Sequence, residues 1–166
     1  MEKKQFSWFV AIPVLIIVLC MTTLNSCSSK QDEVLQYYTS GEVSRKHTEV
    51  NGKKEGVMIE YYKDGKIRGE RVFKNDMQVG KTTFYFPSGK IKESQYYEEG
   101  KQHGADTVFY EDGSPEFVRN FNLGMLDGYV RKWDSTGVVI YEAKFKNDTL
   151  VEVKGEPIRP DSLHQK

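Results

Sequence analysis

The sequence predicts an all-β protein, an elongated meander of stacked antiparallel β-hairpins with a 24-residue period. Glycine recurs at this interval in two series, and aromatic residues keep the same interval before the first series and at the end of each unit. The first series, expected in turns, is Gly41, Gly65, Gly89, Gly113 and Gly137, and the second is Gly56, Gly80, Gly104 and Gly128. A fixed interval of this length is the signature of a repeat architecture.

Composition agrees with a strand-rich fold and argues against one class of partner. The 166 residues include ten Tyr, nine Phe and two Trp, which suit the half-buried surfaces of a β-sheet. A chain of this length forms at most one domain. Lys and Arg number 24 and are balanced by 24 Asp and Glu, so no basic field exists to attract nucleic acid.

Residues 1–26 are predicted to be a signal peptide. Lys3 and Lys4 precede an apolar run from Trp8 to Met21, and small polar residues follow before Cys27. The run is about 14 residues long, shorter than the roughly 20 that a spanning helix needs. An uncleaved N-terminal anchor is the alternative.

Leu24-Asn25-Ser26-Cys27 resembles a bacterial lipobox. The resemblance implies that Cys27 becomes the lipidated first residue, with 27–36 as a polar tether; Cys20 is the competing lipidation site. We therefore expect a lipid anchor in the membrane of the cell envelope, at the outer membrane, with the periplasmic or surface side left open.

Residues 37–152 are predicted to form five hairpin repeats, giving nine or ten strands. The first strands are expected at 57–62, 81–86, 105–110 and 129–133, and the second strands at 67–74, 91–98, 115–122 and 139–146. Dipeptides such as Asp64-Gly65 join them, because glycine adopts positive φ at low steric cost. Residues 153–166 are expected to be a polar tail.

The length of the turn decides which residues share a face. A two-residue loop pairs odd with even positions, whereas a three-residue loop with a glycine bulge pairs odd with odd. The apolar count favours the second. It predicts one face with Val57, Ile59, Tyr61, Ile67 and Phe73, and an opposite face with Met58, Glu60, Arg68, Glu70 and Val72; Tyr62, Phe86 and Tyr110 form a second aromatic file there.

Tyr-Tyr-Lys-Asp-Gly-Lys-Ile at 61–67, Tyr-Phe-Pro-Ser-Gly-Lys-Ile at 85–91 and Phe-Tyr-Glu-Asp-Gly-Ser-Pro at 109–115 resemble the bacterial variant of the MORN repeat. The resemblance covers roughly 37–150 and implies an elongated hairpin sheet that contacts proteins or lipids. Some such proteins are labelled YwqK-type antitoxins, a role that fits poorly with an exported chain. Glu49, Asp134 and Glu152 depart from the pattern in the terminal units, as capping of a stack would require.

Catalytic and metal chemistry find little support, so we expect a protein that is not an enzyme and needs no cofactor or metal. His47, His103 and His164 are far apart in the sequence. The aspartates beside turn glycines and asparagines suit turns rather than calcium. Glu60 with Glu70, or Glu98 with Glu99, would be the pair of an envelope hydrolase, but a narrow sheet offers no cleft for one.

The aromatic row formed by Tyr61, Tyr85, Phe109 and Trp133 is the candidate binding site. Two strand spacings, roughly 10 Å, separate successive members. They act as cross-strand packing pairs, as a contact surface, or as both. The expected function is a non-enzymatic protein–protein interaction module with an unidentified protein partner. The alternative is carbohydrate or peptidoglycan binding, with a glycan as the partner.

Overall fold

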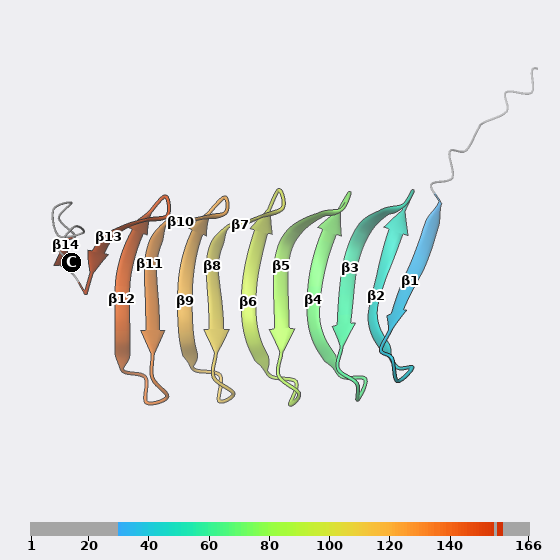
Figure 1. Ribbon diagram of the computed structural model, residues 1–166, viewed down its shortest axis with the longest axis horizontal. Helices are drawn as coiled ribbons and strands as arrows, with labels where there is room; N and C mark the ends of the chain where they lie inside the picture. The colour runs from blue at the N-terminus through green and yellow to red at the C-terminus, as the bar shows by residue number, and fades with distance from the viewer. Residues whose placement is uncertain (1–29, 155, 158–166) are drawn as a thin grey trace, which may run out of the picture.

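A computed structural model describes residues 30–154 and 156–157, so the predicted signal peptide, Cys27 and most of the C-terminal tail lie outside the described residues. The described residues form one open antiparallel sheet of fourteen strands, which confirms the predicted meander (Figure 1). The strands are β1 (Gln31–Tyr37), β2 (Val43–Val50), β3 (Lys53–Tyr61), β4 (Ile67–Lys74), β5 (Met77–Tyr85), β6 (Ile91–Glu98), β7 (Lys101–Gln102), β8 (Gly104–Phe109), β9 (Pro115–Asn122), β10 (Met125–Leu126), β11 (Gly128–Trp133), β12 (Val139–Lys146), β13 (Thr149–Val153) and β14 (Glu156–Pro157).

Strands that follow one another in sequence lie side by side, apart from the short β7 and β10, which pair with β6 and β9. The strand count exceeds the expected nine or ten because both ends extend the sheet and because the short β7 and β10 are separate from β8 and β11. Residues 31–36, placed in the tether from sequence, belong to β1. Glu156 and Pro157, placed in the tail, pair with β13. Polar composition did not prevent either strand, because an edge strand is held by main-chain pairing on one side.

The first turn of each hairpin has the predicted three-residue loop. In the second unit the Gly65 N–H donates to the Tyr62 carbonyl at 3.0 Å, and the Tyr62 N–H donates to the Lys66 carbonyl at 2.8 Å. Gly65 has φ +82°, a left-handed conformation that glycine adopts without steric cost. The same pair of hydrogen bonds recurs at Gly41, Gly89, Gly113 and Gly137.

A bulge that the sequence did not reveal follows each of these turns and changes the register. Tyr61 pairs with Ile67, but Glu60 pairs with Gly69, so Arg68 is an extra residue in β4. Beyond it odd positions of one strand face even positions of the next, which corrects the predicted face for Phe73. Phe73 lies opposite Gly56 and shares the face of Met58, while Glu70 and Val72 move to the face of Val57.

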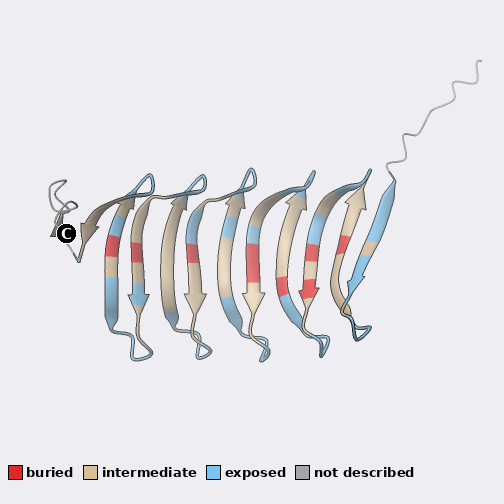
Figure 2. Ribbon diagram, viewed as in Figure 1, coloured by how far each residue is buried: buried red, intermediate tan, exposed pale blue. Residues whose placement is uncertain are grey.

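We call the face that carries Met58, Glu60 and Phe73 the inner face, and the face that carries Val57, Ile59 and Tyr61 the outer face. Of the buried side chains in the described residues, only Thr83 lies on the outer face. The inner-face ones are His47, Met58, Glu60, Thr82, Asp106, Val130 and Ala143. Figure 2 shows that they form a band across the middle of the arched strands. More than half of this thin core is polar.

Two contacts recur along the sheet, one within each hairpin and one between successive hairpins. Within each hairpin, the second-series glycine pairs with the closing aromatic residue, as Gly56 does with Phe73 and Gly80 with Tyr97. The predicted second aromatic file instead links successive units. The hydroxyls of Tyr38, Tyr62 and Tyr110 donate to the carbonyls of Tyr61, Tyr85 and Trp133 at 2.6, 2.6 and 2.8 Å.

Candidate functional site

The structure brings the predicted aromatic row together on the outer face. Tyr61, Tyr85, Phe109 and Trp133 each end the first strand of a hairpin, and each pairs with the residue that opens the second strand. All four rings are half-buried. Partial burial means that the row both packs within the sheet and reaches solvent.

Shallow hollows recur along this row at intervals of one repeat. The first, about 530 Å³, is lined by Leu35, Val43 and Tyr61. The second, about 460 Å³, lies between Ile67 and Tyr85, and the third, about 370 Å³, between Ile91 and Phe109. Ile67 and Ile91 are 39% and 41% exposed. Each hollow therefore combines an aromatic ring with an aliphatic side chain of a neighbouring hairpin.

Glu70 holds Tyr85, in the middle of the aromatic row, through a hydrogen bond. The Tyr85 hydroxyl donates to Glu70 Oε2 at 2.7 Å, and this hydrogen bond to an acceptor raises the pKa of Tyr85 above its ordinary value. Glu70 lies on the outer face and Glu60 on the inner face, so these two carboxylates do not form the pair that a glycosidase would need.

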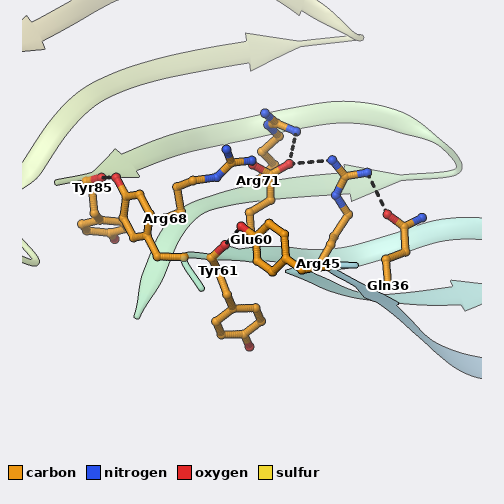
Figure 3. Close-up of polar contacts among 9 residues, drawn as sticks. Gln36, Arg45, Glu60, Tyr61, Arg68, Arg71 and Tyr85 are labelled. Carbon is orange, nitrogen blue, oxygen red and sulfur yellow. Dashed lines mark hydrogen bonds and ion pairs between the residues drawn. The ribbon is translucent and has the colours of Figure 1, made fainter. Parts of the chain in front are cut away.

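A second feature, on the inner face, is a cluster of three arginines around one buried carboxylate (Figure 3). Glu60 is 3% exposed. Its Oε1 accepts from Arg45 at 2.9 Å and from Arg71 at 3.0 Å, and its Oε2 accepts from Arg68 at 2.9 Å. Arg45 also donates to Gln36 at 3.2 Å. We call Arg45, Glu60, Arg68 and Arg71 the arginine cluster.

Charge within the arginine cluster is unbalanced. Burial alone would raise the pKa of Glu60, but Arg71, Arg45 and Arg68 outweigh it and hold the pKa below its ordinary value. Glu60 is therefore ionised near neutral pH and neutralises one of the three guanidinium groups. The cluster keeps two positive charges.

The arginine cluster borders a hollow of about 390 Å³ that opens on the sheet surface. Arg68, Arg71 and Lys92 line it together with the aromatic rings of Tyr62 and Phe84. The Arg71 guanidinium lies over the Phe84 ring, 5.2 Å from its centroid, in a cation–π contact. We call this depression the inner hollow.

Glu93, at the far side of the inner hollow, has a different environment. Burial raises the pKa of Glu93, and the nearby Asp106 carboxylate adds to the increase. Asp106 itself is 2% exposed and accepts from Arg119 at 2.5 Å. The inner face thus carries another ion pair, on β8 and β9, with β5 and β6 between it and the arginine cluster.

Three repeats of this chain match the MORN repeat variant. The matched residues are 54–75, 78–99 and 126–147. No curated protein matches the sequence of this chain. A solved structure that resembles it, the crystal structure of accessory secretory protein 1,2 and 3 in Streptococcus pneumoniae, is 17% identical with a TM-score of 0.36. That match covers 61% of this chain and 19% of the other.

The matched segments 54–75 and 78–99 are consecutive and supply the residues that line the inner hollow. Sequence reasoning missed it because Glu60 was considered as one carboxylate of a hydrolase pair, Arg68 only as a residue of the face opposite Val57, and Arg71 was not singled out. One signal could have found it. At the position of Glu60, the following units carry Phe84, Val108 and Lys132, so the acid departs from the repeat.

The remaining polar candidates have structural contacts. Asp64, Asp112 and Asp134 accept main-chain N–H groups two residues ahead, in the turns. The pKa of each is lowered, mainly by the Lys66 N–H at Asp64 and by the hydroxyls of Ser114 and Thr136 at Asp112 and Asp134. His47 Nε2 lies 3.1 Å from Glu49 Oε1, and His164 lies outside the described residues. In 30–154 and 156–157, no group of three His, Cys, Asp or Glu side chains is placed to hold a metal.

Proposed function

We propose that the protein is a lipid-anchored component of the cell envelope, at the outer membrane, and works as a non-enzymatic module that binds another protein through its sheet. The observation that carries this proposal is the outer-face row of three hollows, one repeat apart and bordered by exposed aliphatic side chains. Contiguous apolar surface on a soluble domain is characteristic of interaction sites.

The shape of the sheet supports a binding role over an enzymatic one. Each hollow is shallow and lies on one face of a single layer, where water reaches the lining residues. Catalysis relies on sites from which water is excluded, whereas a partner laid across several strands can contact the whole row.

Anchoring rests on the lipobox resemblance at Leu24–Cys27, which lies outside the described residues. In the part of the chain that the structure describes, no helix is long and apolar enough to cross a membrane. Labelled palmitate should enter the wild-type protein and not Cys27→Ala. Labelling of Cys27→Ala, or of Cys20 instead, would contradict the proposed lipid site.

Binding is tested with a photo-crosslinking amino acid in place of Ile91, which is 41% exposed between two hollows. Met77 is 50% exposed at the start of β5, away from the row, and provides the matched control position. A single protein crosslinked in cells from position 91 and not from 77 supports the module. Equal crosslinking from both positions, or none from 91, contradicts it.

Carbohydrate or peptidoglycan binding is the second candidate, because the aromatic row also has a regular spacing of about two strands, roughly 10 Å. Aromatic rings at fixed intervals can stack on successive sugars of a glycan. Titration with soluble peptidoglycan fragments should change the fluorescence of Trp133 if this candidate is correct. Unchanged fluorescence at saturating fragment concentrations would exclude binding at that end of the row.

A further inference from the structure

We propose that the inner hollow is a carboxylate-binding site that takes an acidic side chain of a peptide, flanked by apolar residues. The proposal rests on the proposed function in that it names a second surface for a protein partner. Its charged residues lie on the other side of the sheet from the outer-face row, although Tyr85 of that row also lines the hollow.

Local charge supplies the first argument. The arginine cluster has two positive charges in excess, and Lys92 adds a third at the hollow. Glu93 offsets at most one of them and less when it is protonated. A protein whose net charge is zero therefore concentrates positive charge at one depression of its surface.

Bulges in the strands direct Arg68 and Lys92 towards the hollow. Arg68 and Lys92 are the extra residues of the bulges in β4 and β6, where Glu60 pairs with Gly69 and Phe84 with Glu93. A bulge redirects a side chain that regular pairing would send to the other face. The side chains of Arg68 and Arg71 are 47% and 27% exposed, so they keep N–H groups for a ligand after binding Glu60.

Stability alone is a weak explanation for the arginine cluster. Replacing buried ion pairs with apolar residues is often neutral or stabilising. This sheet contains such a replacement, since the position of Arg71 is occupied by Ala143 in the last unit, opposite Val130. The same strands therefore form without the cluster, which favours a role in binding.

The lining decides the class of ligand. Guanidinium groups bind carboxylates through paired N–H donors. The Tyr62 and Phe84 rings offer apolar contact beside them, and the Glu60 and Glu93 carboxyls would repel a doubly charged group such as phosphate more than a single carboxylate. A hollow of about 390 Å³ has room for a few side chains rather than a folded domain.

The test uses the full-length protein in detergent micelles and two amidated, fluorescently labelled peptides, Gly-Phe-Glu-Phe-Gly and Gly-Phe-Gln-Phe-Gly. Fluorescence anisotropy should show that the Glu peptide binds about tenfold more tightly than the Gln peptide, because one charge-assisted hydrogen bond is lost. Raising the salt concentration should weaken binding of the Glu peptide.

Arg68→Gln should reduce binding of the Glu peptide about tenfold. Lys132→Gln is the matched control, since Lys132 occupies the position of Glu60 in the last unit and lies outside the hollow. Lys132→Gln should leave the affinity unchanged. A thermal melt of each variant shows that a loss of binding is not a loss of folding.

Equal affinity for both peptides, no binding at millimolar peptide, or unchanged binding by Arg68→Gln would overturn the proposal. Inorganic phosphate and vesicles containing an anionic phospholipid are the competing probes. Arg68-dependent binding of either one, tighter than that of the Glu peptide, would also overturn it. These results are separate from crosslinking at Ile91, which tests the outer face.

Discussion

Two copies of one repeat, 54–75 and 126–147, share a fold and differ in their inner faces. Both match the same family model, and both pair their strands in the same register. In the first copy Met58 faces Arg71 and Glu60 faces Gly69. At the equivalent positions of the second copy, Val130 faces Ala143, and Lys132 faces Tyr141.

The difference teaches which residues the fold needs. The turn glycines and the closing aromatic residues are common to both copies, whereas the residues of the inner-face pairs change without changing a strand. The shared residues determine backbone conformation and pairing, and the variable ones have room for function. The predictions below test this division.

The largest effect is expected for Glu60→Ala. Removal of the carboxylate leaves three guanidinium groups together, so the free energy of unfolding should fall by about 2–4 kcal/mol. This loss is smaller than that for breaking a fully buried ion pair, because the arginines reach water. Urea unfolding measures the change. Lys132→Ala, the matched substitution in the second copy, should stay within about 0.5 kcal/mol of wild type. Similar losses in both variants would contradict the comparison.

Gly69→Ala should lower the free energy of unfolding by about 1–3 kcal/mol, as overpacking does. A Cβ atom at Gly69 would lie 2.7 Å from Phe84 Cδ1, so the ring, which also contacts Arg71, must shift. In a Phe84→Ala background the same substitution should cost much less, because the clash is gone. Equal costs in the two backgrounds would show that the Phe84 ring is not the reason for a glycine at position 69.

Tyr62→Phe should cost about 1 kcal/mol, the usual net value of one hydrogen bond. It removes the 2.6 Å bond to the Tyr85 carbonyl that links two units. Phe86 occupies the same position one unit later and has no hydroxyl, so Phe86→Tyr should add a link and stabilise by up to about 1 kcal/mol. Thermal melts measure both. Destabilisation by Phe86→Tyr would mean that no carbonyl is within reach there.

The smallest effects concern pH, and they have opposite signs for two carboxyls of the inner hollow. The pKa of Glu60 is lowered, so its stabilisation is complete above about 4.3, the ordinary glutamate value, and is lost as pH falls through the folded-state pKa. The pKa of Glu93 is raised, so its contribution is complete below that value and is lost as pH rises through its folded-state pKa.

Melting temperatures from pH 3 to 8 for wild type, Glu60→Gln and Glu93→Gln separate these contributions. The deficit of Glu60→Gln relative to wild type should shrink towards acid pH. Glu93→Gln should gain on wild type as pH rises. Parallel pH profiles for all three proteins would show that neither carboxyl has a shifted pKa.

Sequence alone predicted much of the fold and the outer-face row of the candidate site, but not the arginine cluster. The 24-residue period and the first-turn glycines located the hairpins, because a turn depends on residues that are neighbours in the chain. Tyr61, Tyr85, Phe109 and Trp133 were placed correctly on one face, since the residues between them and the turn are few.

The inner face was predicted less well. Phe73 was assigned to the face of Tyr61, and Glu70 to that of Glu60, because the bulge at Arg68 was not visible in the sequence. A shift of one residue exchanges the two faces of a strand, so every position beyond the bulge was affected. The arginine cluster depended on this shift and was therefore missed.

The sequence by itself determined the repeat, its turns and the order of the strands, because these follow from the conformations open to glycine and from contacts between adjacent segments. Only the tertiary structure decided which side chains meet across β2, β3 and β4, and so assembled Arg45, Arg68 and Arg71 around Glu60. The physical reason is that register is a cooperative property of paired strands, set by hydrogen bonds along their whole length rather than by any single residue.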